Sequence, residues 1–120
     1  MSRNASIIAG SRGITDPNVV LAAVAFAVSE GIVPSVVISG GARGVDTLGE
    51  QWAKSAGIPV EVYPAEWGKY GKKAGTMRNV RMGNIAIALI AVWDGKSPGT
   101  KHMIDFARRN NLKVYVHATA

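Results

Sequence analysis

Short apolar runs rich in β-branched residues alternate with helix-length stretches along the chain, and this alternation limits the fold more than any other feature. The predicted strands cover residues 5–9, 35–39, 58–63, 85–93 and 112–116. They are nearly continuous in apolar residues, which is typical of parallel strands that are buried on both faces. We therefore predict an α/β fold, a Rossmann-like three-layer sandwich with a mostly parallel sheet of about five strands.

Capping residues and prolines mark where the helices begin. Asp16 precedes Pro17, an N-cap residue followed by a proline at the first helical position, and Ser97 and Pro98 repeat this arrangement. Helices are predicted over residues 17–30, 45–56, 75–84 and 98–110. With 120 residues and no linker or internal repeat, the chain has the size of one domain, and we predict a single domain over residues 1–120.

The composition excludes several classes of protein. There is no cysteine, which rules out disulfides, thiol catalysis and cysteine metal sites. The two histidines, His102 and His117, show no metal-ligand spacing, so we assign no metal site and no cofactor. No apolar run reaches the roughly 18 residues that a membrane span needs, and no signal peptide is evident. We expect a cytoplasmic protein of a bacterium or phage, without a membrane partner.

The whole chain has a net charge of +6, and much of its positive charge lies in one segment. The basic segment, residues 67–82, contains no acid and five cations: Lys69, Lys72, Lys73, Arg78 and Arg81. An arbitrary basic stretch is often only a solvated surface. Here glycines and aromatic residues lie between the charges, which favours a mobile loop that binds an anion.

Glycine-rich loops follow three of the predicted strands. The first, second and third glycine loops are residues 10–13, 39–44 and 94–100. The carboxyl ends of parallel strands meet at one edge of the sheet, so these loops should lie together, each leading into a helix N-terminus. One such loop is often only a tight turn. Three of them, with Arg12, Arg43 and Lys96 in or beside them, predict a phosphate site.

The loops match neither of the familiar phosphate motifs. The dinucleotide fingerprint G-x-G-x-x-G and the P-loop pattern G-x-x-x-x-G-K-[ST] are both absent from the sequence. An ordinary dehydrogenase or a P-loop NTPase is therefore not expected.

Three stretches resemble the SLOG superfamily: SGGARGVD at residues 39–46, WGKYGKKAGTMRNVRM at residues 67–82 and AVWDGKSPGTKHMIDFA at residues 91–107. Within it the chain is most similar to the YspA/YpsA-like branch, which is related to the lonely-guy phosphoribohydrolases and to DprA. The resemblance extends from residue 7 to residue 116 in the right order. It implies a Rossmann-like fold, commonly oligomeric, with a pocket for a nucleotide or nucleotide derivative at the glycine loops.

The resemblance also implies a set of ligand-binding residues. These are Gly10, Ser11, Gly40, Gly41, Gly44, Arg78, Asn79, Gly99 and Thr100. Arg12 and Arg43 join the predicted ligand-binding set because they are cations in or beside the glycine loops. Gly10 and Ser11 would lie at the base or ribose end of the pocket. The phosphate would be held by Gly40, Gly41, Gly44, Gly99 and Thr100. Arg78 and Asn79 would close over it, because a guanidinium makes bidentate contacts to phosphate oxygens. The alternative for Arg78 is an exposed surface arginine.

The sequence departs from the lonely-guy enzymes at the position that matters for catalysis. Those enzymes cleave the N-glycosidic bond of a nucleoside monophosphate, and Met103 stands where their glutamate would be. Asp105 lies about 200° around the predicted helix from Met103, so it should face elsewhere. An enzyme would need Asp46 or Asp94 as its catalytic carboxylate. Each also has a structural explanation. Asp46 would interact favourably with the dipole of the helix at whose start it lies, and Asp94 would orient the turn in which it lies.

Residues 19–28 (VVLAAVAFAV) are apolar almost all round. A helix of this kind is either fully buried or faces a partner chain, so we predict a homodimer or higher oligomer with this helix near the contact.

Three functions remain open. We favour a protein that binds a small nucleotide-type ligand and senses or sequesters it. The second is an N-glycosidase or phosphoribohydrolase that acts on a nucleotide or an NAD-related molecule. The third is a single-stranded nucleic-acid binder, which the net charge of +6 allows, although no track of stacking aromatics is evident.

Overall fold

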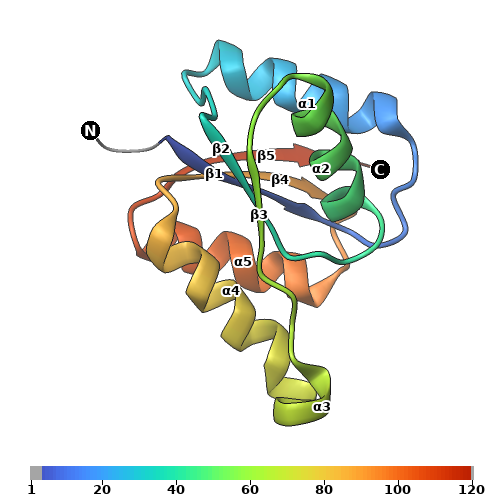
Figure 1. The fold of residues 1–120 in the computed structure, drawn as a ribbon, viewed down its shortest axis with the longest axis vertical. Helices are drawn as coiled ribbons and strands as arrows, with labels where there is room; N and C mark the ends of the chain where they lie inside the picture. The colour runs from blue at the N-terminus through green and yellow to red at the C-terminus, as the bar shows by residue number, and fades with distance from the viewer. Residues whose placement is uncertain (1–3, 120) are drawn as a thin grey trace.

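The computed structural model describes residues 4–119. Its strands form one five-stranded sheet in the order β3-β2-β1-β4-β5 (Figure 1). They are β1 (Ala5–Gly10), β2 (Val36–Ser39), β3 (Val60–Val62), β4 (Ala88–Trp93) and β5 (Lys113–Ala118). Every neighbouring pair is parallel. The predicted Rossmann-like α/β fold is confirmed, and the sheet is parallel throughout the described residues.

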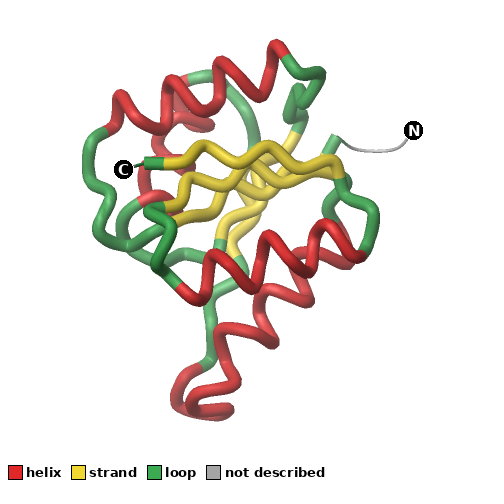
Figure 2. Tube along the Cα trace, turned by 180° about the vertical axis from the view of Figure 1, so that it is seen from behind, coloured by secondary structure: helices red, strands yellow, loops and turns green. Residues whose placement is uncertain are grey.

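Helices cover both faces of the sheet (Figures 1 and 2). The helices α1 (Pro17–Ser29) and α2 (Val45–Ser55) lie on one face, and α4 (Ala74–Ile85) and α5 (Pro98–Arg109) lie on the other. Alternate strand residues supply the two cores: Ile7 packs among the buried residues of α4 and α5, whereas Ile8 packs among those of α1 and α2. Both faces of β1 are therefore apolar, which explains its unbroken apolar run.

The two predicted N-caps differ in what their side chains do. Asp16 caps α1 as predicted, because its Oδ1 accepts the N–H of Asn18 at 2.9 Å. Ser97 occupies the N-cap position of α5, but its side chain makes no capping hydrogen bond. Its hydroxyl instead donates to Asp94 Oδ2 at 3.0 Å and lies 3.1 Å from the Ser11 hydroxyl. Ser97 therefore ties the third glycine loop to the first.

The start of the basic segment is helical, so the prediction of a loop there is wrong. Trp67–Tyr70 form the short helix α3, and Gly71–Lys73 form a 3₁₀ helix that runs into α4. The segment contains no proline, and the left-handed φ of 58° at Gly71 lets the chain turn between the two helical pieces. This corner projects below the sheet in Figure 1.

The outer face of α1 is apolar and exposed. Its inner residues, such as Ala23 and Ala27, are buried, whereas Leu21 and Val28 are exposed and Phe26 keeps 57% of its surface. The Phe26 ring stacks on His117 of the edge strand β5, with 6.2 Å between centroids. Within residues 4–119, no helix has both the length and the apolar character that crossing a bilayer requires.

Candidate functional site

The three glycine loops meet at the carboxyl edge of the sheet and border a cleft with two lobes. The inner lobe, about 370 Å³, lies between the first and third glycine loops. The outer lobe, about 600 Å³, lies between the second glycine loop and the chain entering α3. Arg12, Ala42, Trp67 and Arg78 line both lobes and form their shared boundary.

The inner lobe combines an apolar floor with polar walls. Met82 of α4 and Met103 of α5 form the floor, and both are buried. Ser11, Asn79 and Thr100 lie on the walls, and they too are buried. An apolar surface with a few fixed hydrogen-bonding groups is the usual lining of a small-molecule pocket.

The N-terminus of α5 adds backbone donors to the inner lobe. Pro98 has no N–H, and within residues 4–119 no acceptor is found for the backbone N–H groups of Gly99 and Thr100. Gly99 instead supplies its carbonyl, which accepts from Asn79 Nδ2 at 3.2 Å. The α5 N-terminus, next to an open lobe, is a favourable place for an anion.

Arg78 reaches from α4 to the second glycine loop. Its Nη1 donates to the Gly40 carbonyl at 2.6 Å, and its Nε donates to Asn79 Oδ1 at 3.1 Å. Gly40 permits this approach, because a Cβ there would collide with Arg78 Nη1 and would lie 2.8 Å from Asp46 Oδ2. Arg78 is therefore a half-buried guanidinium at the junction of the lobes and not an exposed surface arginine.

Asp46 is a buried carboxyl in the wall of the inner lobe. It is 5% exposed, and its Oδ2 accepts the N–H of Ala42 at 3.1 Å. Burial raises the pKa of Asp46 to about 6, although the Ala42 hydrogen bond and the Arg78 charge lower it; the nearby charge of Glu50 raises it further. Asp46 thus titrates near neutral pH, as a catalytic acid or base does.

Asp94 has a different environment. Its carboxylate accepts the backbone N–H groups of Ser97 and Lys96, both at 2.8 Å. These two hydrogen bonds lower the pKa of Asp94 to about 2. The side chain lines neither lobe of the cleft in the described part of the chain. Asp94 therefore orients the turn of the third glycine loop.

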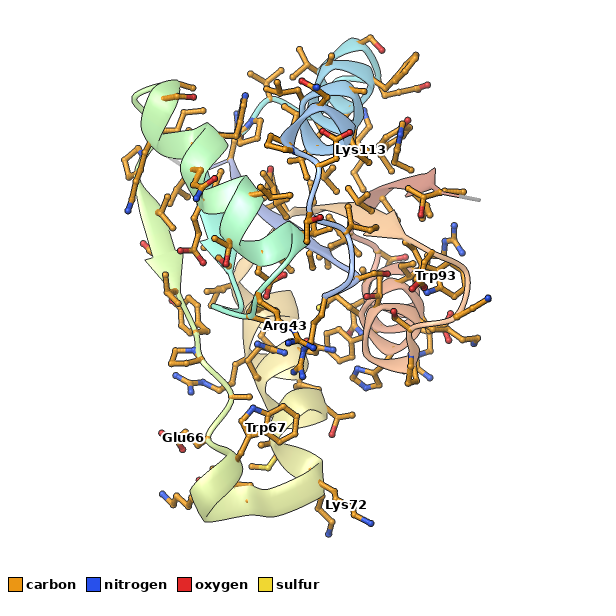
Figure 3. All side chains as sticks on the ribbon, turned by 90° about the vertical axis from the view of Figure 1, so that its right-hand side faces the viewer. Arg43, Glu66, Trp67, Lys72, Trp93 and Lys113 are labelled. Atoms are coloured by element: carbon orange, nitrogen blue, oxygen red, sulfur yellow. The ribbon has the colours of Figure 1, made fainter. Side chains whose placement is uncertain are left out.

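Trp67 forms an aromatic wall at the boundary of the lobes. Its indole keeps 50% of its surface exposed and lies under the Arg12 guanidinium, 5.7 Å from the ring centroid. Figure 3 places Arg43 and Trp67 one above the other on the same side of the molecule, with Lys72 pointing away from both. A half-exposed indole in a cleft is a surface on which a flat ring can stack.

Most of the predicted ligand-binding residues line the cleft, but they fall into two groups. Gly10, Ser11, Asn79, Gly99 and Thr100 line the inner lobe; Gly40, Gly41 and Arg43 line the outer lobe; Arg12 and Arg78 line both. Gly44 lines neither, because its left-handed φ of 77° lets it lie beneath the first glycine loop, where a Cβ would be 2.6 Å from the Ser11 carbonyl. The phosphate-binding set proposed from the sequence is thus divided between two places.

The position that departs from the lonely-guy pattern does face the cleft. Met103 lies on the floor of the inner lobe, whereas Asp105 turns outward and its carboxylate pairs with Lys101 at 2.7 Å. The expectation that Asp105 faces elsewhere is confirmed. Sequence reasoning missed the methionine floor. A signal was present, because Met82 follows Asn79 and Met103 follows Thr100 by three residues. Residues at this i+3 spacing lie on the same face of a helix.

Comparisons with known proteins agree with the fold. The X-ray structure of DNA processing protein A (DprA) from Streptococcus pneumoniae matches 96% of this chain with a TM-score of 0.67 and 15% sequence identity. This likeness places the chain among Rossmann-like α/β proteins. The chain spans only 50% of that structure's length.

The sequence comparisons give the family. The model of the YspA, cpYpsA-related SLOG family matches residues 7–70, which include the first and second glycine loops. Gene 61 protein of Mycobacterium phage D29 is 33% identical over 114 residues, covering 90% of this chain and 91% of that protein. The chain belongs to the YspA, cpYpsA-related SLOG family, and its phage relative fits a protein encoded by a bacterium or a phage.

Proposed function

We propose that the protein binds a nucleotide or nucleotide-derived phosphorylated ligand in the two-lobed cleft and acts as a sensor or sequestering protein. The observation that carries the proposal is the half-buried Arg78 guanidinium, fixed by the Gly40 carbonyl at 2.6 Å between the two lobes. A fixed guanidinium beside open space is suited to a phosphate, because it offers paired donors in a rigid plane.

The lining of the inner lobe supports a nucleoside at that end. The Thr100 hydroxyl lies above the methionine floor and can bond a ligand, as can the remaining lone pair of Asn79 Oδ1, whereas the Asn79 amide N–H groups are held by Gly99 and His102 and the Ser11 hydroxyl by the third glycine loop. A ribose or base needs a few directional partners and an apolar surface, and both are present. In this orientation the phosphate of the ligand points from the inner lobe toward Arg12 and Arg78.

A thermal-shift screen at low and high salt tests the proposal. The probes are nucleoside mono- and diphosphates, ADP-ribose, NAD, cyclic nucleotides and a short single-stranded DNA. A ligand at about 100 times its dissociation constant adds roughly 2.7 kcal/mol to the stability of the folded protein. We expect one small nucleotide to stabilise the wild type much more than Arg78→Ala, at both salt concentrations.

Stabilisation by DNA alone, and only at low salt, would contradict the proposal. It would favour the single-stranded nucleic-acid alternative. Binding to the DNA phosphates releases counterions, so its affinity falls steeply as the salt concentration rises. The likeness in fold to a DNA processing protein of Streptococcus pneumoniae gives a reason to include this probe.

The buried Asp46 carboxyl favours a second candidate, an N-glycosidase or phosphoribohydrolase that acts on a nucleotide or an NAD-related molecule. Its pKa of about 6 and its place in the wall of the inner lobe suit a general base. Asp46 would take a proton from water, whose oxygen bonds to the anomeric carbon as the N-glycosidic bond breaks. The departing base takes up one proton, which balances the proton removed from water.

Release of free base, followed by chromatography, tests this activity. The rate should rise with pH through about 6, because only the ionised Asp46 accepts a proton. Asp46→Asn should abolish turnover and retain binding. Asp94→Asn should retain turnover if Asp94 only shapes its loop. Turnover that survives in Asp46→Asn would assign the chemistry to another group.

We also propose that two copies associate through the outer face of α1 and that the protein acts in the cytoplasm. The exposed Leu21, Phe26 and Val28 support the association, because several large apolar side chains left exposed on one helix are typical of protein contacts.

A further inference from the structure

The outer lobe carries more positive charge than the inner lobe. Arg12, Arg43 and Arg78 line it, and no acidic residue does so among the described residues. The inner lobe shares Arg12 and Arg78 but also contains Asp46. A cavity lined by one sign of charge concentrates ions of the opposite sign, so the outer lobe is the more attractive place for an anion.

Arg43 in particular has no partner that would explain its position. It is exposed on the second glycine loop, and within residues 4–119 its guanidinium makes no hydrogen bond or ion pair. The Arg12 guanidinium lies over the Trp67 ring and likewise has no carboxylate partner in this range. Both side chains therefore retain their full capacity to bind an anion.

The arginines also act on one another. Burial lowers the pKa of Arg78, the neighbouring Asp46 raises it, and the positive charge of Arg12 lowers it again. Arg12 and Arg78 thus repel each other across the boundary of the lobes. An anion bound between them and Arg43 would relieve this repulsion, which adds to its binding energy.

A second position for an anion lies on the other side of the boundary. The N–H groups of Gly99 and Thr100 border the inner lobe, whereas Gly41 and Arg43 border the outer lobe alone. Only Arg12 and Arg78, among the charged residues, reach both. In a ligand with two phosphates in series, one phosphate can bind the N–H groups of Gly99 and Thr100 and the other can bind Gly41 and Arg43. The oxygen that bridges the two phosphates would then lie at Arg78.

We infer that the outer lobe is a subsite for a second phosphate, so that the ligand is a nucleoside 5′-diphosphate or an ester of one, and not a nucleoside monophosphate. This inference rests on the proposed function, because it places the nucleoside in the inner lobe. It assigns Arg43 as the residue that distinguishes the two ligand classes.

Isothermal titration calorimetry with matched pairs of nucleotides tests the inference. The probes are AMP and ADP with the corresponding pairs of guanine, cytosine and uracil nucleotides, together with inorganic phosphate and pyrophosphate. The variants are Arg43→Ala and, as a matched control, Arg108→Ala, which removes the same charge from the exposed far end of α5. All titrations use one salt concentration, because charge contacts depend on it.

For the base that fits, the diphosphate should bind at least about tenfold more tightly than the monophosphate, which corresponds to about 1.4 kcal/mol. Arg43→Ala should remove most of this preference and leave monophosphate binding little changed, and Arg108→Ala should keep the preference. Inorganic pyrophosphate should bind more weakly than the nucleoside diphosphate, because it lacks the ribose and base that would contact the walls and the methionine floor of the inner lobe.

The results that overturn the inference differ from those that overturn the proposed function. Equal affinity for mono- and diphosphate, or an equal loss of both in Arg43→Ala, would refute the second-phosphate subsite and leave nucleotide binding intact. Pyrophosphate that binds as tightly as the diphosphate would refute the nucleoside part of the inference. No binding of any nucleotide would refute the proposed function, and the inference with it.

Discussion

Burial of Asp46 should make the stability of the protein fall as pH rises through the acidic range. Its pKa is raised from 3.8 to about 6 in the folded protein, chiefly by burial. The folded state therefore holds the proton over a pH range in which the unfolded chain has released it. At about 1.36 kcal/mol for each unit of pKa, the difference corresponds to about 3 kcal/mol. This stability is present below pH about 3.8, decreases up to pH about 6 and is lost above it.

Urea unfolding of the wild type and of Asp46→Asn measures this effect. The pH is varied from roughly 3.5 to 7, a range that includes the pKa of Asp46 in the unfolded and in the folded state. The asparagine cannot ionise, so Asp46→Asn should gain about 3 kcal/mol relative to the wild type across that range. The control is Asp105→Asn, because the pKa of the exposed Asp105 is lowered by its hydrogen bond to Lys101. That variant should lose stability relative to the wild type as pH rises, the opposite sign. A flat difference for Asp46→Asn would mean that Asp46 is ionised well below pH 6, and the reasoning from burial would be refuted.

Other predictions concern the cleft and the surface. Ligand binding should quench tryptophan fluorescence in the wild type and in Trp52→Phe but not in Trp67→Phe, since Trp67 lines the cleft. Gly40→Ala should destabilise the fold by about 1–3 kcal/mol and weaken nucleotide binding, because its Cβ would displace Arg78; wild-type affinity would contradict this. Phe26→Glu should convert a dimer to a monomer in sedimentation experiments, whereas a monomeric wild type would exclude the contact.

The sheet was predictable because β1, β2 and β4 are buried on both faces and carry apolar residues in nearly every position. The start of β4 was not predictable. The predicted strand began at Ile85, whereas in the structure α4 ends at Ile85 and β4 begins at Ala88. An apolar run of this kind fits the end of a buried helix as well as a strand. Local pattern alone does not decide between them.

The site was predictable to the extent that parallel topology brings the ends of strands together. The loops after β1, β2 and β4 are neighbours because those strands are adjacent in the sheet. The division into two lobes was not predictable, because it depends on where Arg78 and Trp67 reach across from α4 and α3. The opposite pKa shifts of Asp46 and Asp94 could not be predicted from the sequence either, because they depend on burial and on turn hydrogen bonds that exist only in the folded structure.

An NMR titration of ¹⁵N-labelled protein with the nucleotide that gives the largest thermal shift would show whether the ligand occupies the cleft, because glycine N–H signals report on each loop separately. Our account predicts that the signals of Gly10, Gly41 and Gly99 move together and saturably, while that of Gly57, at the far end of α2, stays in place. Shifts confined to the lysines of α3 and the 3₁₀ helix, with the three loop glycines unmoved, would contradict a nucleotide site in the cleft.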